Sequence, residues 1–398
     1  MQIDLPPGVS SILATLSDNG HDAYAVGGCV RDSLMGRPPA DWDIASSAEP
    51  REVKRLFPQT YDTGVKHGTV TVAADGGRYE VTAFRVDGTY LDGRRPESVT
   101  FSRNIEDDLS RRDFTMNAIA FNPARGFIDP FGGRVDIARK IIRCVGEAER
   151  RFGEDALRML RAARFAAQLG FTIDPDTLSA IAPLANRLEL ISAERIREEL
   201  TRLLISPYPT AGVMLEETGL LTYALRGRAY GGNLPHALGL IEKCPKDTAM
   251  RCALFIYWAG AEAETVLRDL RFDNKTARET VTYVEWLDKG LPRRPYEIKK
   301  ALNILTPEYF FRLLTLKSIF TPGLTDEIPR ARKTAEGIIE RGECYSLKTL
   351  AVSGDDLQKA GVPGGKTTGE TLGRLLDAVM RDPGMNEKGR LMYMINSE

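Results

Sequence analysis

The 398-residue sequence contains little histidine and little cysteine. Its three histidines, His21, His67 and His236, leave little scope for a histidine metal site or a histidine general base. The five cysteines are odd in number and include no C-x-x-C pair, which argues against a disulfide framework or a zinc site. Metal chemistry must therefore use oxygen ligands, which favours magnesium or manganese, and the unpaired thiols favour a reducing cytoplasm.

Long apolar runs are also missing. No run approaches the roughly 18 residues that a membrane-spanning helix needs. The N-terminus lacks a basic segment followed by an apolar core, so no signal peptide is expected. The net charge of −1 gives no overall case for nucleic-acid binding. However, residues 139–164 carry eight Lys or Arg against four Asp or Glu, as in a solvated helix face or a phosphate-binding stripe.

Hydrophobic periodicity divides the chain into a mixed N-terminal region and a long helical remainder. The segments 23–28 and 41–46 have the pattern of strands, with a short helix between them. Two alternating runs flank Asp75-Gly76-Gly77, which predicts a β-hairpin. From Glu147 onward the pattern is helical almost throughout. The sequence thus predicts an α+β protein whose mixed region ends near residue 145.

Two carboxylates stand two residues apart in the segment "ADWDI". On a strand, Asp41 and Asp43 would point to the same face, about 7 Å apart at Cα, while Trp42 and Ile44 point into the core. Such a pair can chelate divalent cations that activate a hydroxyl and hold a triphosphate. A pair of surface aspartates would give the same pattern.

A glycine turn precedes this pair. Gly27 and Gly28 follow the first predicted strand, and Arg31 lies one turn into the helix after them. Paired glycines allow backbone N–H groups to approach phosphate oxygens, and an arginine can bind a phosphate through two hydrogen bonds. The turn and the carboxylates together predict a nucleotide and metal site.

The stretch "GGCVRDSLMGRPPADWDIA" resembles the first motif of the polymerase-beta-like nucleotidyltransferases, in the form found in class II tRNA CCA-adding enzymes and bacterial poly(A) polymerases. Later segments resemble further motifs of this family in the same order, so that the clear resemblance covers Val26 to about Leu204. These segments are "RRDFTMNAIAFNP", "IDPFGGRVDIARKIIRCVGEAERRF", "EDALRMLRAARF" and "ISAERIREELTRLL".

The resemblance implies a nucleotidyltransferase head with a mixed sheet and helices, followed by an all-helical neck, body and tail. We place the catalytic head at residues 1–145 and the neck, which would select the nucleobase, at 146–205. The body is then 206–300, and the tail, which would bind tRNA, is 301–398.

The resemblance also implies roles for individual residues. Asp41 and Asp43 would be the catalytic carboxylates that bind metal, in a mechanism with two Mg²⁺ ions. Glu80, on the hairpin strand "YEVTAF", would complete the carboxylate cluster, although an exposed strand glutamate is an equally good account. Gly28 and Arg31 would contact the triphosphate.

The segment "RRDFTMNA" is similar to the family's ribose-recognition motif. Arg112 and Asp113 would therefore hold the ribose and phosphate, because an aspartate can accept a hydrogen bond from a ribose hydroxyl. Asp113 can also act as the N-cap of a helix over "FTMNAIAF", and both roles can hold together.

The stretch "RFGEDALRMLRAARF" is typical of an amphipathic helix. Its apolar side would consist of Ala156, Met159, Leu160, Ala163 and Ala167. Pairing of Glu154 with Arg158 at i,i+4 would stabilise such a helix by about 0.2–0.5 kcal/mol. That single pair leaves three charged residues without an explanation, namely Asp155, Arg161 and Arg164.

The family reading uses all of them. An aspartate accepts from the exocyclic amine of cytosine or adenine, and an arginine donates to the adjacent ring nitrogen, whereas uracil and guanine present the opposite polarity. Asp155 and Arg158 would thus admit only CTP and ATP. Arg161 and Arg164 would bind phosphate or RNA.

We therefore expect template-independent addition of CCA to tRNA from CTP and ATP, with the tRNA 3′ end and acceptor and T-arm backbone as contacts. No membrane and no stable protein partner is expected, and the protein should be cytoplasmic. The sequence does not distinguish this activity from that of an A-adding enzyme. The presence of the loop at residues 92–101 argues against a CC-adding enzyme, and the sequence "TGVKHGTVTV" at 63–72 argues against a poly(A) polymerase. A silent tRNA-binding protein is disfavoured by the intact motifs.

Overall fold

The computed structural model describes residues 3–65, 68–88, 99–227, 231–324 and 326–396. By the density of internal contacts, the chain divides into two compact units. The first comprises Met1–Glu242 and Phe255–Ala277, and the second comprises Lys243–Leu254 and Arg278–Glu398. The division into head, neck, body and tail at residues 145, 205 and 300 stays a prediction.

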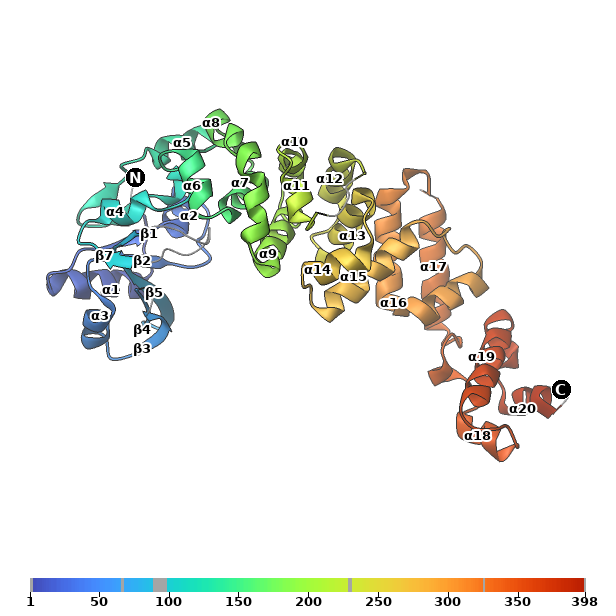
Figure 1. The fold of residues 1–398 in the computed structure, drawn as a ribbon. Helices are drawn as coiled ribbons and strands as arrows, with labels where there is room; N and C mark the ends of the chain where they lie inside the picture. Colours follow the sequence, from blue (N-terminus) through green and yellow to red (C-terminus); the bar gives the residue numbers. More distant parts are fainter. Residues whose placement is uncertain (1–2, 66–67, 89–98, 228–230, 325, 397–398) are drawn as a thin grey trace. The chain divides into compact units, whose positions relative to one another are not determined.

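A mixed sheet forms the centre of the N-terminal region (Figure 1). In the described residues it has seven strands in the order β3-β4-β5-β2-β1-β8-β9. Neighbouring strands are antiparallel except for β2 and β5, which are parallel. The strands are β1 (Ala23–Val26), β2 (Asp43–Ser46), β3 (Thr60–Gly64), β4 (Thr69–Ala74), β5 (Gly77–Ala83), β8 (Ala120–Asn122) and β9 (Gly126–Ile128).

Two small sheets accompany it. β6 (Arg85–Asp87) pairs with β7 (Val99–Phe101), and β10 (Ile141–Ile142) pairs with β11 (Thr172–Ile173). The loop predicted at 92–101 falls mainly on residues 92–98, which lie outside the described residues, as do residues 66–67 of the stretch 63–72.

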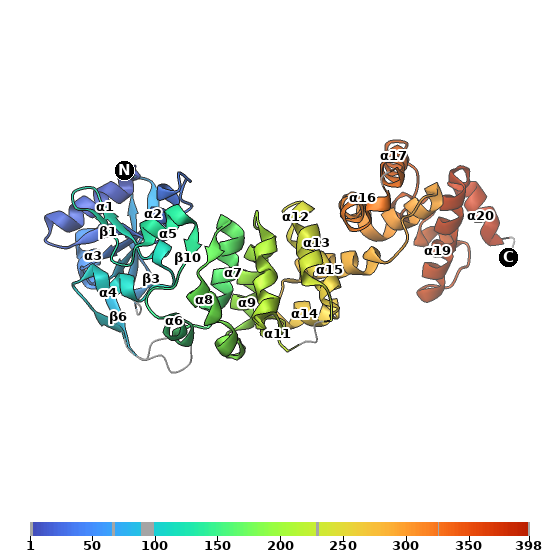
Figure 2. The same cartoon turned by 90° about the horizontal axis from the view of Figure 1, so that it is seen from above.

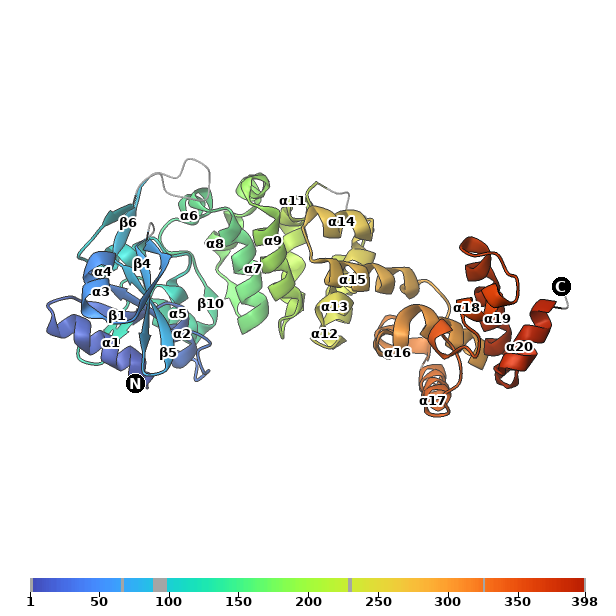
Figure 3. The same cartoon turned by 90° about the horizontal axis from the view of Figure 1, so that it is seen from below.

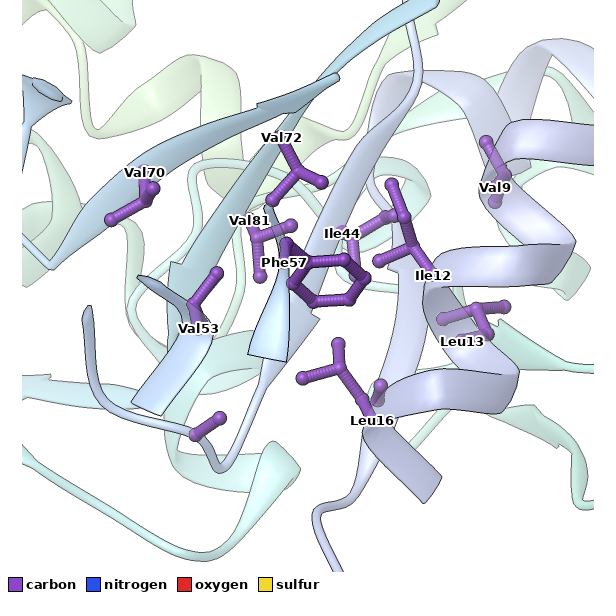
Figure 4. Packing of buried hydrophobic residues seen from close by; sticks show 12 residues of the cluster. Val9, Ile12, Leu13, Leu16, Ile44, Val53, Phe57, Val70, Val72 and Val81 are labelled. Atoms are coloured by element: carbon purple, nitrogen blue, oxygen red, sulfur yellow. The ribbon is translucent and has the colours of Figure 1, made fainter. Parts of the chain in front are cut away.

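Helices cover the sheet and supply much of its core. One cluster of buried side chains joins α1 and α3 to strands β2, β4 and β5 (Figure 4). The alternation of valines along β4 and the spacing of apolar residues along α1 bring both elements to this core. The helices of this region are α1 (Pro7–Asp18), α2 (Gly28–Leu34), α3 (Pro50–Leu56), α4 (Ile105–Ser110) and α5 (Gly133–Arg139).

The predicted hairpin is confirmed as β4 and β5. Asp75 and Gly76 connect these strands with φ angles of 46° and 77°. Both values are left-handed, as a tight two-residue hairpin turn requires, which explains the choice of Asp and Gly at these positions. The parallel pairing of β5 with β2 then brings this hairpin next to the strand that begins at Asp43.

The expectation of a helix over "FTMNAIAF" is wrong. Only Thr115–Asn117 form a short 3-10 turn, and the chain then enters β8, which pairs with β1. Ile119 and Phe121 are buried in the sheet, so tertiary packing outweighs the local signal for a helix.

From Glu147 the chain is mainly helical, as predicted, and beyond Ile173 the described residues contain no strand (Figures 2 and 3). The helices up to residue 287 are α6 (Ala148–Glu154), α7 (Leu157–Leu169), α8 (Pro175–Ser179), α9 (Ala193–Leu204), α10 (Met214–Glu217), α11 (Leu220–Ala224), α12 (Leu234–Lys243), α13 (Thr248–Ala259), α14 (Ala263–Asp269) and α15 (Asn274–Leu287). They are followed by α16 (Pro295–Phe320), α17 (Glu327–Glu340), α18 (Gly354–Lys359), α19 (Lys366–Arg381) and α20 (Lys388–Asn396). None of the described helices is both long and apolar enough to cross a membrane.

All five cysteines are free and buried. Burial raises the pKa of Cys29 to about 11 and the pKa of Cys144, Cys244 and Cys252 to about 12.

Candidate active site

A cavity of about 550 Å³ in the first unit brings most of the predicted site residues together. It lies among the β1–α2 turn, the start of β2, the segment after α4, and helices α7 and α9. Its lining contains Gly27, Gly28, Arg31, Asp41, Asp43, Arg111, Arg112, Asp113, Asn117, Asp155, Arg158, Arg161, Arg164, Phe165, Arg195 and Arg202. Eight of these are arginines and four are aspartates, so the cavity carries an excess of positive charge suited to a polyanion.

Gly27 allows the side chain of Arg112 to lie close to the backbone of the β1–α2 turn. Its φ of 78° and ψ of −128° belong to a region that is essentially restricted to glycine. A Cβ at this position would lie 2.7 Å from Arg112 Nη1. The glycine turn therefore provides room for the Arg112 guanidinium beside the start of α2.

The two predicted carboxylates both line the cavity, but only Asp43 lies on a strand. Asp43 opens β2, whereas Asp41 precedes it, so the expectation that both lie on the strand is wrong for Asp41. Ile44 is buried and Trp42 packs against the core, as predicted. Asp41 thus reaches the cavity from the connection that leads into the strand.

Glu80 lies directly opposite Asp43, because β5 and β2 are paired in parallel register. The pKa of Asp43 is raised to about 6, first because the surrounding protein weakens its hydration and then because Asp41 is close, while Arg112 opposes the rise and Glu80 adds to it. A cation between Asp41 and Asp43 would relieve this repulsion, so the pair suits a divalent metal. Among the described residues, no group of three or more His, Cys, Asp or Glu is arranged to hold a metal ion.

The two arginines of "RRD" are held by a carboxylate that the sequence analysis did not single out. Asp108 on α4 accepts hydrogen bonds from Arg111 Nε at 3.0 Å and from Arg112 Nη2 at 3.1 Å. Burial favours the neutral acid, but the two guanidinium groups nevertheless hold the pKa of Asp108 below its usual range. Asp108 therefore remains charged and fixes both arginines at the cavity.

Asp113 is fixed by hydrogen bonds to both of its oxygens. Oδ1 accepts from the Phe114 N–H at 2.8 Å and from Asn117 Nδ2 at 3.0 Å, and Oδ2 accepts from Arg161 Nε and Nη2 at 2.8 and 2.6 Å. Burial opposes the charge, yet Arg161 and these hydrogen bonds lower the pKa of Asp113. Asp113, which was predicted to contact the ribose, is thus a negatively charged group held in one orientation.

Arg31 points toward the same group of residues. Its Nη1 donates to Asn117 Oδ1 at 2.6 Å and its Nε donates to Asp32 Oδ1 at 2.9 Å. The guanidinium also lies 5.2 Å from the centroid of the Phe165 ring, which comes from α7.

The helix predicted over residues 151–165 is interrupted. α6 ends at Glu154, and α7 begins at Leu157. Asp155 between them has extended backbone, with φ −143° and ψ 104°, and its Oδ1 accepts from the Leu157 N–H at 3.1 Å. The apolar residues predicted for the core side are buried as expected; they are Ala156, Met159, Leu160, Ala163 and Ala167.

The two predicted base-reading residues both have protein partners. Arg195 on α9 binds Asp155 through two hydrogen bonds of 2.7 and 3.3 Å. Arg158 makes the predicted pair with Glu154 at 2.8 Å, and its Nη2 donates to the Arg111 carbonyl at 2.8 Å. Arg195 was not identified from the sequence.

The remaining charged residues of this stretch, which pairing within one helix left unexplained, also have protein partners. Arg161 binds Asp113, and Arg164 Nε donates to Glu199 of α9. Glu199 also lies 3.7 Å from Arg161. Because these partners come from other elements, spacing within one helix could not reveal them.

Comparison with known proteins identifies the family. Residues 23–143 match the poly A polymerase head domain, and residues 170–230 match the probable RNA and SrmB-binding site of polymerase A. A CCA-adding enzyme of Geobacillus stearothermophilus is 44% identical over 388 residues, which cover 96% of this chain and 94% of that protein. The CCA-adding enzyme of Levilactobacillus brevis is 37% identical over 385 residues, covering 96% of both.

The crystal structure of the Bacillus stearothermophilus CCA-adding enzyme in complex with CTP is similar over 99% of this chain and 98% of its own, with a TM-score of 0.84 and 38% identity. The likeness confirms the predicted fold class, a mixed-sheet head followed by helices. The chain belongs to the family of CCA-adding enzymes.

Proposed function

We propose that the protein adds CCA to the 3′ end of tRNA without a nucleic-acid template, using CTP and ATP and releasing pyrophosphate. The observation that carries the proposal is the arginine-rich cavity, which is lined both by Asp41 and Asp43 and by Asp155 and Arg158. The terminal tRNA hydroxyl would attack the α-phosphate, forming a new P–O bond while the bond to the leaving pyrophosphate breaks.

Asp41 and Asp43 are the residues that would hold a divalent cation, which we propose is Mg²⁺. When bound, such a cation stabilises charge on phosphate oxygens and helps to activate the attacking hydroxyl. Glu80 would add negative charge beside Asp43 from the neighbouring strand. The chain's own contribution is to hold the reacting groups in line in a partly enclosed site.

The arginines would bind the nucleotide's phosphates. The Gly28 turn and Arg31 lie at the opening of α2, and Arg112 is fixed beside them by Asp108. Arginines that are already oriented by carboxylates lose less side-chain entropy when a triphosphate binds. Arg161 and Arg164 line the same cavity, and their positive charge would also attract phosphate groups of the nucleotide or the RNA.

The nucleobase would be read by Asp155 and Arg158. The carboxylate accepts from the amine of cytosine or adenine, and the guanidinium donates to the adjacent ring nitrogen. The pairing of Asp155 with Arg195 supports this role, because two hydrogen bonds from the guanidinium orient the carboxylate at the cavity. Arg112 and Asp113 would contact the ribose.

We place the protein in the cytoplasm, where tRNA is its partner and where the five unpaired cysteines would remain reduced. The helices after residue 205 would contact the tRNA by shape and phosphate rather than by base sequence. Contacts to the acceptor and T-arm backbone are part of this proposal.

The test is incubation of tRNA that lacks its CCA end with each labelled nucleotide alone and with CTP and ATP together. We expect two residues from CTP alone and three from the mixture. No incorporation into this tRNA, together with addition of A to tRNA that already ends in CC, would indicate an A-adding enzyme. Addition that stops after CC in the mixture would indicate a CC-adding enzyme, and long A tails would indicate a poly(A) polymerase.

The carboxylates are tested by replacing both Asp41 and Asp43 with Asn, which should abolish incorporation. Asp62→Asn is the matched control, because Asp62 is an exposed aspartate on β3 of the same sheet and does not line the cavity. If the double variant retained wild-type incorporation, the proposed metal-binding role would be wrong.

A further inference from the structure

The aromatic ring of Phe165 lies among three arginines of the cavity. Phe165 is on α7, is 5% exposed and lines the cavity. The guanidinium carbons of these arginines lie 3.9, 5.2 and 5.3 Å from the centroid of its ring, for Arg164, Arg31 and Arg161 respectively. All three distances are within the roughly 6 Å over which an aromatic ring attracts a cation. An apolar side chain thus lies at the centre of the arginines that were predicted to bind phosphate.

The three arginines come from two different elements. Arg161 and Arg164 precede Phe165 on α7, whereas Arg31 is on α2, directly after the glycine turn. Spacing along α7 brings Arg161 to the ring, because residues four apart are neighbours on a helix surface. Arg31 reaches the ring only through the packing of the first unit. Phe165 therefore connects the arginine of the glycine turn to the arginines of α7.

Positive charge is crowded at this point. Burial lowers the pKa of Arg164, and the nearby Arg161 adds to this effect, while Glu199 opposes it. A further carboxylate would relieve the crowding, but it would also neutralise the charge and occupy N–H groups that a phosphate needs. The face of an aromatic ring attracts a cation without accepting its in-plane N–H groups as a carboxylate does.

A second aromatic residue holds the ring of Phe165 in place. Phe114 is completely buried, and its ring lies 5.8 Å from that of Phe165 at an interplanar angle of 86°. Such an edge-to-face arrangement is a favoured geometry for an aromatic pair. A ring that is fixed in this way keeps the arginines around it oriented before a ligand arrives. The ligand then pays a smaller cost in side-chain entropy when it binds.

We infer that Phe165 is a positioning residue, whose ring holds Arg31, Arg161 and Arg164 in place for the triphosphate of the incoming nucleotide. The inference rests on the proposed function, because it assumes a nucleoside triphosphate in this cavity. The triphosphate is common to all nucleotides. Loss of the ring should therefore weaken the binding of CTP and ATP alike and leave the choice of base unchanged.

Inorganic tripolyphosphate is the direct probe, because it carries the phosphates without base or sugar. Calorimetry without added metal ion makes its binding report on the arginines rather than on Asp41 and Asp43. Phe165→Leu keeps an apolar side chain and removes the ring, whereas Phe165→Tyr keeps the ring. We expect the Kd for tripolyphosphate to rise about tenfold in Phe165→Leu and to stay within about twofold of the wild-type value in Phe165→Tyr.

Incorporation into tRNA that lacks CCA gives a second readout. In Phe165→Leu the KM for CTP and the KM for ATP should both rise about tenfold, while kcat stays within about twofold of the wild-type value. UTP and GTP should still be refused. A purely structural defect would instead lower kcat through the amount of folded protein.

Phe121→Leu is the matched control. Phe121 is also a buried phenylalanine of the first unit, 4% exposed, but its ring packs against Phe127 at 4.7 Å and does not line the cavity. Its replacement should lower the thermal stability and leave the Kd for tripolyphosphate unchanged. Thermal unfolding establishes that each variant folds. If Phe165→Leu does not fold, Phe165→Met takes its place, because methionine fills irregular gaps in a core without supplying a ring.

The inference is overturned if the variant without the ring binds tripolyphosphate as tightly as the wild-type protein. It is also overturned if Phe165→Tyr or Phe121→Leu weakens binding as much as the loss of the ring does. Failure of the proposed function is a separate result, because the wild-type protein would then not add CCA to the tRNA, whereas binding of tripolyphosphate can still be compared among the variants.

Discussion

Replacement of Glu199 by leucine should destabilise the first unit by about 3 kcal/mol. Glu199 is 5% exposed on α9 and carries the charge that neutralises Arg164 of α7. Its second partner, Arg161, is 3.7 Å away and retains Asp113 when the glutamate is lost. The consequences of the change therefore fall mainly on Arg164.

The magnitude follows from what Arg164 would still contact. Removing one partner of a buried ion pair typically costs about 3–5 kcal/mol, because the other charge remains buried without compensation. Arg164 would retain a hydrogen bond to Gln168 at 2.8 Å and its position 3.9 Å from the Phe165 ring centroid. These contacts compensate part of the loss, which places the expected cost at the lower end of the range.

The neighbouring residue provides the control. Glu198 pairs with Arg202 one turn later, and their side chains are 55% and 50% exposed. An exposed pair of this kind contributes about 0.5 kcal/mol or less, so Glu198→Leu should leave the free energy of unfolding almost unchanged. The two variants remove the same charge from the same helix and differ in burial.

Urea unfolding measures the free energy, and amide hydrogen exchange locates the change. In Glu199→Leu the amides of α7 and α9 should exchange about 100-fold faster than in the wild-type protein, as expected for a loss of about 3 kcal/mol. If Glu199→Leu and Glu198→Leu were equally stable, the buried pair would not hold α7 to α9 and the reasoning would be refuted.

Three further predictions concern the cavity itself. Gly27→Ala should lower kcat/KM more than Gly36→Ala, because both glycines have positive φ but only Gly27 would place a Cβ 2.7 Å from Arg112; equal losses would contradict this. Asp155→Asn should allow UTP and GTP to be incorporated, since an amide can donate as well as accept; measuring each nucleotide separately tests it, and unchanged selectivity would count against the base-reading role. The lowered pKa of Asp113 means that its ionisation stabilises the fold above the ordinary value of 3.8 and that this contribution disappears as the pH falls below that value. Acid unfolding of Asp113→Asn should therefore depend less steeply on pH, and an unchanged slope would argue against the carboxylate's contribution.

Local patterns in the sequence were sufficient for the parts of the site that depend on neighbouring residues. The glycine turn, the hairpin at Asp75 and Gly76, and the buried side of α7 each follow from spacing and conformational preference, and the structure contains all three. The helical remainder follows in the same way from periodicity.

The charge partners could not be predicted in this way. Arg195 is 40 residues from Asp155, and Glu199 is 35 residues from Arg164, so their pairing depends on how α9 packs against α7. The break at Asp155 was missed because the apolar pattern continues across it. The sequence alone thus indicated many of the residues that line the cavity, although not Arg195, and it did not indicate that they bind one another there.

The burial of the five cysteines has a practical consequence for following this protein during its reaction. The thiolate is the form that reacts with labelling reagents, and a thiol whose pKa is raised to about 12, as in Cys144, is almost entirely protonated near neutral pH. A cysteine introduced at an exposed position such as Glu198 should therefore react well before the native thiols. A fluorescent or spin probe can be placed at one chosen point of the wild-type background, without first removing any of its own cysteines.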